Sequence, residues 1–294
     1  MRIGSRIIGA DASLPTRETT MQLGIWIDIR PEQDVPRLFE QVADMGFGAV
    51  QAHFPAGCDA ALARRARRAA ARSGVEIVAV SGYANPLRPA DAPMGFTQAA
   101  LADLVALLPA LDSRHVVTWS GTCAASLFEE DPENQGPAAW DTLRRAVDDL
   151  FPLLDANDAI LVFEPFFAHV LDTPERIVAF CEEVGSPYVR VVLDPPNLLP
   201  PGMWQQQSEL LPPLVAALAP YTGLIHLKDM RLRGAALDLP GPGEGVLDYP
   251  TFLGAVIRAE ISAPLVIEHV ALERAARARR FVLAHLRSAV APAL

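Results

Sequence analysis

The stretch LIHLKD, residues 224–229, is the part of the sequence that most directly indicates the fold and its polar site. Its apolar start predicts a short buried strand, and that strand ends at His226. Three other apolar runs in the second half of the chain end in the same way: LVFE at Glu164, VVLD at Asp194 and LVIE at Glu268. Buried runs seldom end in charged side chains by chance. Four strand ends that each carry a metal-binding type of side chain therefore predict one shared polar site.

The composition limits the class of protein. The chain has 294 residues, of which 51% are hydrophobic, and this is enough for one large barrel or two ordinary domains. A net charge of −10 argues against nucleic acid or an anionic membrane as a partner, because both need a cationic surface. No apolar run reaches the ~18 residues that cross a membrane. The three cysteines lack paired spacing, which indicates free thiols and a cytoplasmic protein.

The order of predicted elements indicates the fold. Residues 1–21 are expected to form a polar lead-in without the apolar segment of a secretory signal, and residues 22–294 a single domain. Within that domain, short β-type runs alternate with amphipathic helical stretches. The predicted strands cover 22–28, 48–54, 75–82, 114–121, 159–164, 189–194, 222–227 and 263–268. The predicted helices cover about 33–45, 59–73, 97–111, 138–155, 174–184, 206–219, 249–260 and 271–290.

Repeated βα units imply parallel strands, because each return to the sheet needs a crossover helix. Eight such units within 294 residues predict an α/β fold consisting of a single (β/α)8 TIM barrel. An open, doubly wound sheet is the main alternative. It would need fewer strands, and no GxGxxG motif opens a helix here.

In such a barrel the active site lies at the carboxyl ends of the strands. Glu164, Asp194, His226 and Glu268 end predicted strands five to eight, so their side chains can converge. Carboxylates with one imidazole suit a divalent cation such as Mn²⁺, Mg²⁺ or Co²⁺, and the absence of a thiolate argues against a structural zinc site. Any one of these residues alone would more often be a cap, an ion-pair partner or a core residue.

Four motifs carry a resemblance to a known family. They are E-P at strand five, L-D-P-x-N at strand six, H-x-K-D followed by P-G-x-G-x-x-D at strand seven, and I-E at strand eight. The sequence resembles the xylose isomerase-like TIM barrel superfamily, the sugar phosphate isomerase/epimerase group, over essentially residues 22–290. This resemblance implies that Glu164, Asp194, His226 and Glu268 hold one divalent metal ion. It also implies that Glu164 and Glu268 form the acid–base pair.

The resemblance implies a metal-dependent isomerase or epimerase of a sugar, a sugar phosphate or a related keto compound. One carboxylate would remove a proton next to the carbonyl, the metal would stabilise the enediolate, and a second carboxylate would return a proton. Mn²⁺ is the expected metal, with Mg²⁺, Co²⁺ and Zn²⁺ as alternatives. A hydro-lyase similar to keto-inositol dehydratases would share the first step and stays open.

Two further alternatives have less support in the sequence. An apurinic endonuclease-like protein predicts a basic groove and more histidines than the six present. A barrel that only binds a sugar would not need the metal ligands. The expected partner is a small sugar-like molecule, and a homo-oligomer stays open because the sequence shows no interface.

Five residues are expected to bind the substrate: Asn197, Lys228, Arg231, His53 and Trp119. Ketose 3-epimerases often have a histidine where Asn197 stands, so the sequence departs from their pattern, and a plain turn residue is the alternative. Lys228 could contact an anionic or carbonyl oxygen, or form a structural ion pair. Some family members place a substrate-binding arginine after the histidine, and either Arg231 or Arg233 could take that place. His53 and Trp119 end strands two and four and could form a wall of the pocket or pack in the core.

The loop at 237–248 is expected to approach the substrate or to be a flexible connector, and Asp248 is predicted to cap the next helix. Asp229 is expected to orient Lys228. His169 and His269 follow two of the metal-ligand candidates in the sequence and could orient these ligands through hydrogen bonds.

Overall fold

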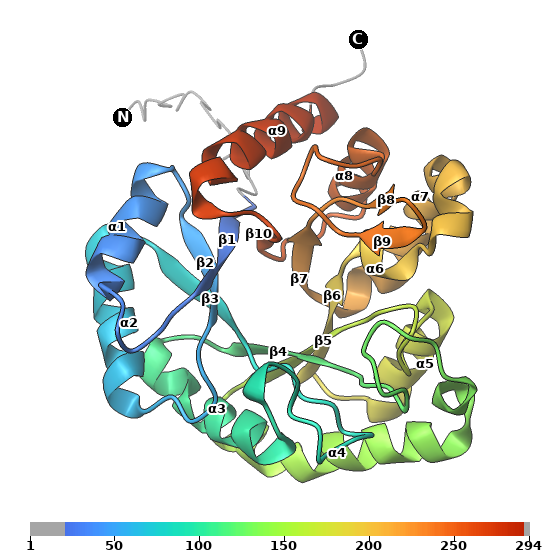
Figure 1. The fold of residues 1–294 in the computed structure, drawn as a ribbon, viewed down its shortest axis with the longest axis horizontal. Coiled ribbons are helices and arrows are strands. Elements are labelled where there is room, and N and C mark those ends of the chain that lie inside the picture. The colour runs from blue at the N-terminus through green and yellow to red at the C-terminus, as the bar shows by residue number, and fades with distance from the viewer. Residues whose placement is uncertain (1–20, 291–294) are drawn as a thin grey trace, which may run out of the picture.

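The computed structural model describes residues 21–290, so nearly all of the predicted lead-in lies outside the described residues. Eight parallel strands close into a barrel in the order β1-β10-β7-β6-β5-β4-β3-β2 (Figure 1). The barrel strands are β1 Leu23–Asp28, β2 Ala49–His53, β3 Glu76–Ser81, β4 His115–Trp119, β5 Ile160–Glu164, β6 Val189–Leu193, β7 Thr222–Leu227 and β10 Leu265–Ile267. The predicted (β/α)8 TIM barrel is confirmed.

The main helices surround the barrel and match the predicted ranges to within two residues at each end (Figure 1). They are α1 Val35–Asp44, α2 Ala60–Ser73, α3 Gln98–Leu111, α4 Pro137–Ala156, α5 Pro174–Val184, α7 Gln207–Leu218, α8 Tyr249–Arg258 and α9 Leu272–Val290. Within residues 21–290, no helix combines the length and the apolar character needed to cross a membrane.

Short polar residues explain where several helices begin. The side chains of Asp59 and Thr97 accept hydrogen bonds from backbone N–H groups in the first turns of α2 and α3. Asp248 does the same for α8, which confirms its predicted role as a cap. Such caps satisfy N–H groups that have no partner inside the helix. At the other end of α2, Gly74 adopts a left-handed conformation with φ of 65°, which glycine adopts at little cost.

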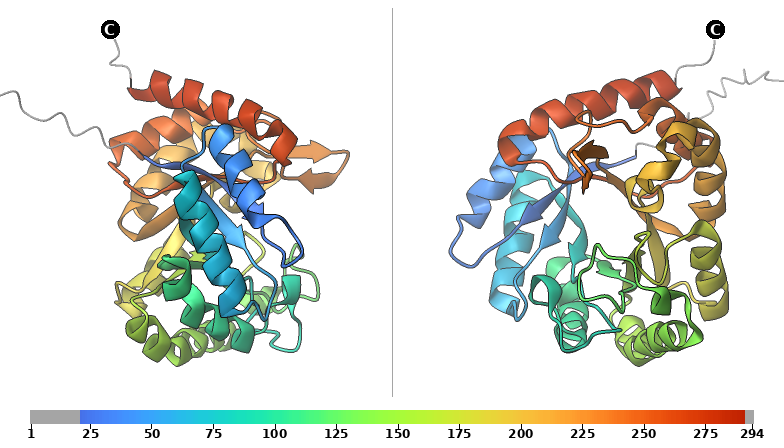
Figure 2. Two further views of the ribbon diagram at one scale, coloured as in Figure 1. Left: turned by 90° about the vertical axis from the view of Figure 1, so that its left-hand side faces the viewer. Right: turned by 45° about the vertical axis from the view of Figure 1, so that its right-hand side comes forward.

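Smaller elements lie in the βα connections. They are α6 Pro195–Leu198, the antiparallel hairpin β8 Arg231–Arg233 and β9 Ala236–Asp238, and four 3₁₀ turns at Pro93–Gly95, Pro132–Gln135, Pro201–Gln206 and Ala219–Tyr221. The sequence prediction missed the hairpin and α6, because these segments are too short to show a periodic pattern. Figure 2 shows the hairpin projecting beyond the barrel.

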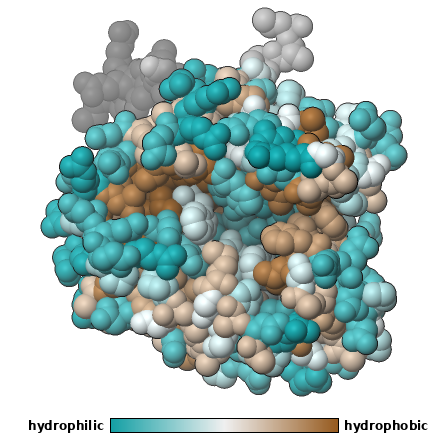
Figure 3. All heavy atoms as spheres, viewed as in Figure 1, coloured by the Kyte–Doolittle hydropathy of each residue, from teal (hydrophilic) through white to brown (hydrophobic). Residues whose placement is uncertain are grey.

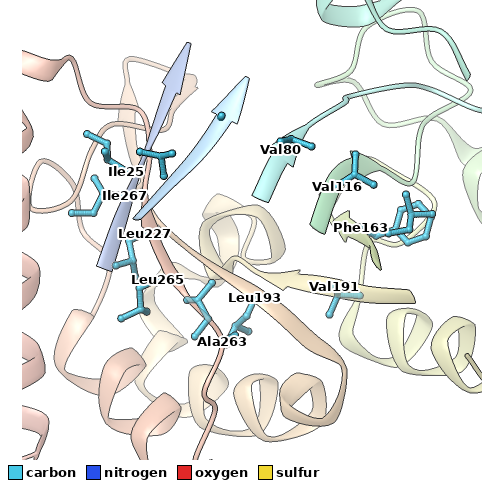
Figure 4. Packing of buried hydrophobic residues seen from close by; sticks show 14 of the residues in the cluster. Ile25, Val80, Val116, Phe163, Val191, Leu193, Leu227, Ala263, Leu265 and Ile267 are labelled. Atoms are coloured by element: carbon cyan, nitrogen blue, oxygen red, sulfur yellow. The ribbon is translucent and has the colours of Figure 1, made fainter. Parts of the chain in front are cut away.

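The core has two layers, one between the strands and the helices and a smaller one inside the barrel. Figure 4 shows part of the outer layer, with Phe163, Leu193, Leu227 and Ile267 contributed by consecutive barrel strands. Successive side chains of a strand point to opposite faces. Packing of these four residues against the helices therefore directs the adjacent residue of each strand into the barrel. This alternation places the four candidate metal ligands on the inside.

Candidate metal centre

Four side chains from neighbouring strands meet at the carboxyl end of the barrel. Glu164, Asp194, His226 and Glu268 each offer one ligand atom, and these atoms lie within 4.8 Å of one another. The Nδ1 atom of His226 lies 3.6 Å from Glu164 Oε2, 3.5 Å from Asp194 Oδ2 and 3.4 Å from Glu268 Oε1. All four side chains are buried, and Asp194 and His226 have no exposed surface. The structure thus brings together the quartet that the sequence singled out.

The donor set fits a divalent cation. Oxygen and nitrogen ligands bind such ions at about 2.1 Å, and a tetrahedral arrangement then separates ligand atoms by about 3.4 Å. Buried polar atoms normally have hydrogen-bond partners, yet His226 Nδ1 and Asp194 Oδ1 have none. Unpartnered donor atoms that face one point are the arrangement that a metal ion would satisfy.

Lys228 lies among the carboxylates. Its Nζ is 2.6 Å from Glu268 Oε1, 2.7 Å from Asp194 Oδ2 and 3.5 Å from Glu164 Oε1. The side chain is almost fully buried. Three carboxylates carry a charge of −3, so one ammonium and one divalent cation would together neutralise them. Such balance matters because an uncompensated buried charge is strongly destabilising.

The charges shift the pKa values of the cluster. Burial alone lowers the pKa of His226, but Glu268 and Glu164 outweigh it and raise the pKa to about 10. Burial alone raises the pKa of Glu268, but His226 and Lys228 hold it well below its ordinary value. Burial likewise lowers the pKa of Lys228, whereas Asp194 and Glu268 raise it above its ordinary value. Without a metal ion, Lys228 and His226 therefore act as the cations of the site.

Glu164 is held by two neutral donors. The Tyr83 hydroxyl donates to Oε2 at 2.7 Å, and Asn197 Nδ2 donates to Oε1 at 3.0 Å. Burial first and Glu164 second raise the pKa of Tyr83, so its phenol keeps the proton that it donates. Asn197 therefore contacts a metal-ligand candidate directly. Tyr83 follows β3 in a proline-rich loop, and no motif of the sequence points to it.

The opposite half of the barrel mouth is aromatic. His53, at the end of β2, stacks on Trp26 with ring centroids 5.6 Å apart and contacts Phe96 edge-on. Trp119, at the end of β4, stacks on Tyr83 at 4.6 Å. The two candidate wall residues thus lie on strands β2 and β4, while the carboxylates and His226 come from the β5–β10 side. In Figure 3 the centre of the viewed face is hydrophilic, with hydrophobic residues on both sides of it.

Arg231 lies on the hairpin rather than in the cluster. Its Nε is 2.6 Å from Asp238 Oδ2, and its Nη1 donates to the Glu244 carbonyl at 2.8 Å. The Glu244 side chain pairs with Arg274 of α9 at 2.8 Å. These contacts tie the hairpin and the following loop to the outer part of the barrel.

Asp229 organises the loop after the hairpin. Its carboxylate accepts hydrogen bonds from the backbone N–H groups of Met230, Gly243 and Leu247. A Cβ atom at Gly245 would collide with the Asp229 carboxylate and the Met230 carbonyl. The P-G-x-G-x-x-D motif therefore folds around Asp229, so the loop is not a free connector. The hydrogen bonds of the Asp229 carboxylate go to backbone N–H groups and not to the Lys228 side chain that it was expected to orient.

The two histidines past the ligand candidates differ in their surroundings. His169 is buried and its Nε2 donates to the Leu127 carbonyl at 3.0 Å. His269 has a φ of 58°, and its Nδ1 lies 2.5 Å from the Leu239 carbonyl. The Nε2 of His269 is 3.9 Å from Glu268 Oε1, so only this histidine approaches the cluster.

We expect Asp229→Asn to lower the free energy of unfolding by about 1–3 kcal/mol, because an amide cannot accept all three backbone hydrogen bonds. Chemical denaturation measures the change. The control is Asp238→Asn, which weakens partly exposed ion pairs of the hairpin and should cost less than about 1 kcal/mol. Equal losses in both variants would contradict the anchoring role of Asp229.

His169 should make stability depend on pH. Burial lowers its pKa to about 4. Between pH 6.5 and 4 the unfolded chain binds a proton that the folded chain does not, so stability falls as pH falls, by up to about 3 kcal/mol. His169→Gln keeps a donor for the Leu127 carbonyl but does not titrate. Its denaturation midpoint should fall less over this pH range, and parallel curves for the two proteins would refute the assignment.

Fold and site together define a (β/α)8 barrel with a carboxylate-rich centre suited to a divalent cation. The chain matches the family model described as xylose isomerase-like TIM barrel over residues 39–287, and it belongs to that family. Among curated proteins, none matches the sequence significantly.

Three solved structures illustrate the likeness. A xylose isomerase-like TIM barrel protein from Mycobacterium smegmatis in complex with magnesium has 19% identity and a TM-score of 0.66, covering 92% of this chain and 98% of the other. An L-ribulose 3-epimerase has 18% identity and a TM-score of 0.68, with 92% and 95% covered. The 3-keto-D-glucoside 4-epimerase from E. coli has 18% identity and a TM-score of 0.64, with 91% and 99% covered. At such identities the likeness shows the fold alone.

Proposed function

We propose that this protein is a divalent-metal-dependent isomerase or epimerase of a sugar or a related keto compound. The observation that carries the proposal is the convergence of four buried ligand atoms, from Glu164, Asp194, His226 and Glu268, on one point. The similar folds of an L-ribulose 3-epimerase and a 3-keto-D-glucoside 4-epimerase support this reaction class.

The proposed cofactor is one divalent metal ion held by the same four residues. Mn²⁺ is the first choice for an oxygen-rich site with one imidazole, and Mg²⁺, Co²⁺ and Zn²⁺ are the alternatives. When bound, the ion would supply positive charge that stabilises the enediolate formed from the substrate carbonyl and its neighbouring carbon.

The two glutamates act as the acid–base pair. Glu268 stays ionised because His226 and Lys228 outweigh the effect of burial on its pKa, so it can accept the proton of the carbon next to the carbonyl. As the C–H bond breaks, its electron pair moves toward the carbonyl oxygen. Glu164, oriented by Tyr83, enters this step as the carboxylic acid and delivers its proton from the other side for epimerisation. Delivery to the neighbouring carbon would give isomerisation instead. After product release, Glu268 loses its proton to solvent and Glu164 regains one from solvent.

We assign substrate contacts to the residues around this pair. His53 and Trp119 present aromatic surface, on which the C–H face of a sugar can stack. Asn197 and Lys228 present donors next to the carboxylates, and Arg231 lies on the hairpin after β7.

The charge pattern favours a substrate without phosphate. A phosphate group needs cationic partners, typically arginine. Several arginines that follow barrel strands are already paired with carboxylates: Arg30 with Asp28, Arg231 with Asp238 and Arg274 with Glu244. An uncharged keto compound fits this pattern better than a sugar phosphate.

Metal removal tests the proposal. Ketoses, ketose phosphates and keto-inositols are incubated with the protein in D₂O, and deuterium uptake next to the carbonyl is followed by NMR. We expect uptake with an unphosphorylated substrate, its loss after EDTA treatment, and its return with Mn²⁺ or Co²⁺. Full activity of the protein shown by elemental analysis to be metal-free would refute the mechanism. Loss of water from a keto-inositol would instead support the hydro-lyase alternative.

Replacement of the proposed base gives a second test. Glu268→Gln should lower the rate of deuterium uptake by about 10²–10⁴-fold, as expected for loss of a general base. Because Glu268 is also a proposed ligand, the rate is compared at saturating metal, with bound metal measured directly. Glu244→Gln, which changes a glutamate paired with Arg274, is the control and should keep the wild-type rate. Unchanged uptake in the metal-loaded Glu268→Gln variant would exclude the role.

A further inference from the structure

We propose that Gln51 is the positioning residue for His226, because its side-chain amide determines which imidazole nitrogen faces the carboxylates. The same amide contacts Tyr83 and thereby connects His226 to Glu164. The inference rests on the proposed metal site and adds to it a residue from the opposite side of the barrel. No motif of the sequence points to Gln51.

Gln51 lies in β2 and is fully buried. Its Oε1 atom is 2.8 Å from Nε2 of His226 in β7. The strands β1 and β10 separate β2 from β7 in the barrel order, so this contact crosses the barrel interior. The other end of the amide, Nε2, donates to Ser81 Oγ at 2.9 Å and to the Tyr83 hydroxyl oxygen at 3.3 Å.

The neighbouring groups fix the direction of these hydrogen bonds. Tyr83 has one hydroxyl proton, and it donates this proton to the Glu164 carboxylate at 2.7 Å. The Tyr83 oxygen can therefore only accept from Gln51. Ser81 Oγ also receives an N–H group from Trp26, at 3.1 Å. The NH₂ group of Gln51 thus faces Tyr83 and Ser81, and its carbonyl oxygen faces His226.

A carbonyl oxygen only accepts hydrogen bonds, so the Nε2 atom of His226 must carry a proton. In the neutral imidazole, Nδ1 then has the free lone pair. This atom is the one that lies 3.4–3.6 Å from the three carboxylates. A reversed amide would place N–H opposite Nε2, put the proton on Nδ1 and direct an N–H group toward the cation. The orientation of Gln51 therefore decides whether His226 can be a ligand.

The test measures metal affinity, which a merely structural glutamine would not affect. Isothermal titration calorimetry with Mn²⁺ and Zn²⁺ compares the metal-free full-length wild type with two variants. Gln51→Met introduces a side chain of similar size that has no hydrogen-bond acceptor. Its metal affinity should be about 10–100-fold weaker, which is the usual loss when a residue that hydrogen-bonds to a metal ligand is removed. Gln51→Glu keeps an acceptor oxygen for His226 and should bind within about fivefold of the wild type.

The control variant is Thr118→Val, which removes a buried hydroxyl that accepts a hydrogen bond from the Ala84 backbone N–H and is not hydrogen-bonded to a ligand candidate. Its affinity should equal that of the wild type. If Gln51→Met does not fold, Ser81→Ala replaces it. This variant removes the acceptor 2.9 Å from the Gln51 NH₂ group without removing a hydrogen bond to a ligand candidate, and it should also bind metal more weakly than the wild type.

NMR gives an independent readout. In the ¹⁵N-labelled, Zn²⁺-loaded wild type, the Nε2 proton of His226 should exchange slowly with water, because it is buried and bonded to Gln51. In Gln51→Met this protection should be lost. Wild-type affinity in Gln51→Met, with Zn²⁺ bound and the Nε2 proton still protected, would overturn the role of Gln51 alone. A wild type that binds neither cation would overturn the proposed metal site as well.

Discussion

The central constraint on this molecule is the burial of three carboxylates at one end of a parallel barrel. Charges removed from water are stable only when other charges and hydrogen bonds compensate them. Lys228, His226 and the donors on Glu164 supply part of this compensation. The remaining charge, together with the unpartnered Oδ1 atom of Asp194 and Nδ1 atom of His226, matches what a divalent cation provides. The fold therefore holds a site whose own electrostatics favour a metal ion.

The barrel makes this concentration of charge possible through strand periodicity. Apolar residues such as Phe163 and Ile267 fix the strands against the helices, and the next residue on each strand must then point inward. A shift of one residue in any strand would exchange a buried hydrophobic residue for a charged one. The packing that stabilises the barrel and the alignment of the ligands therefore have the same cause.

The same periodicity explains what the sequence alone could predict. Strands, helices and the ligand quartet follow from local patterns and from the rule that strand ends meet at one rim. The contact between Gln51 and His226 spans 175 positions in the chain and joins strands that are not neighbours, so no local pattern signals it. Tyr83 lies in an irregular loop after β3, where no periodic pattern in the sequence predicts which way a side chain points. The sequence predicts either a substrate contact or an ion pair for Lys228, but its place among the carboxylates depends on the closed barrel.

The two proposed acid–base residues have different environments. Glu268 is stabilised by charges, from Lys228 and His226, and these hold its pKa low. Glu164 is stabilised largely by hydrogen bonds from Tyr83 and Asn197, which are neutral donors. Two carboxyl groups in unlike surroundings can take different roles at one pH. The cations keep Glu268 ionised, which is the state in which it can accept a proton, whereas a phenol and an amide orient Glu164. The asymmetry of the site thus matches a reaction that uses its two sides differently.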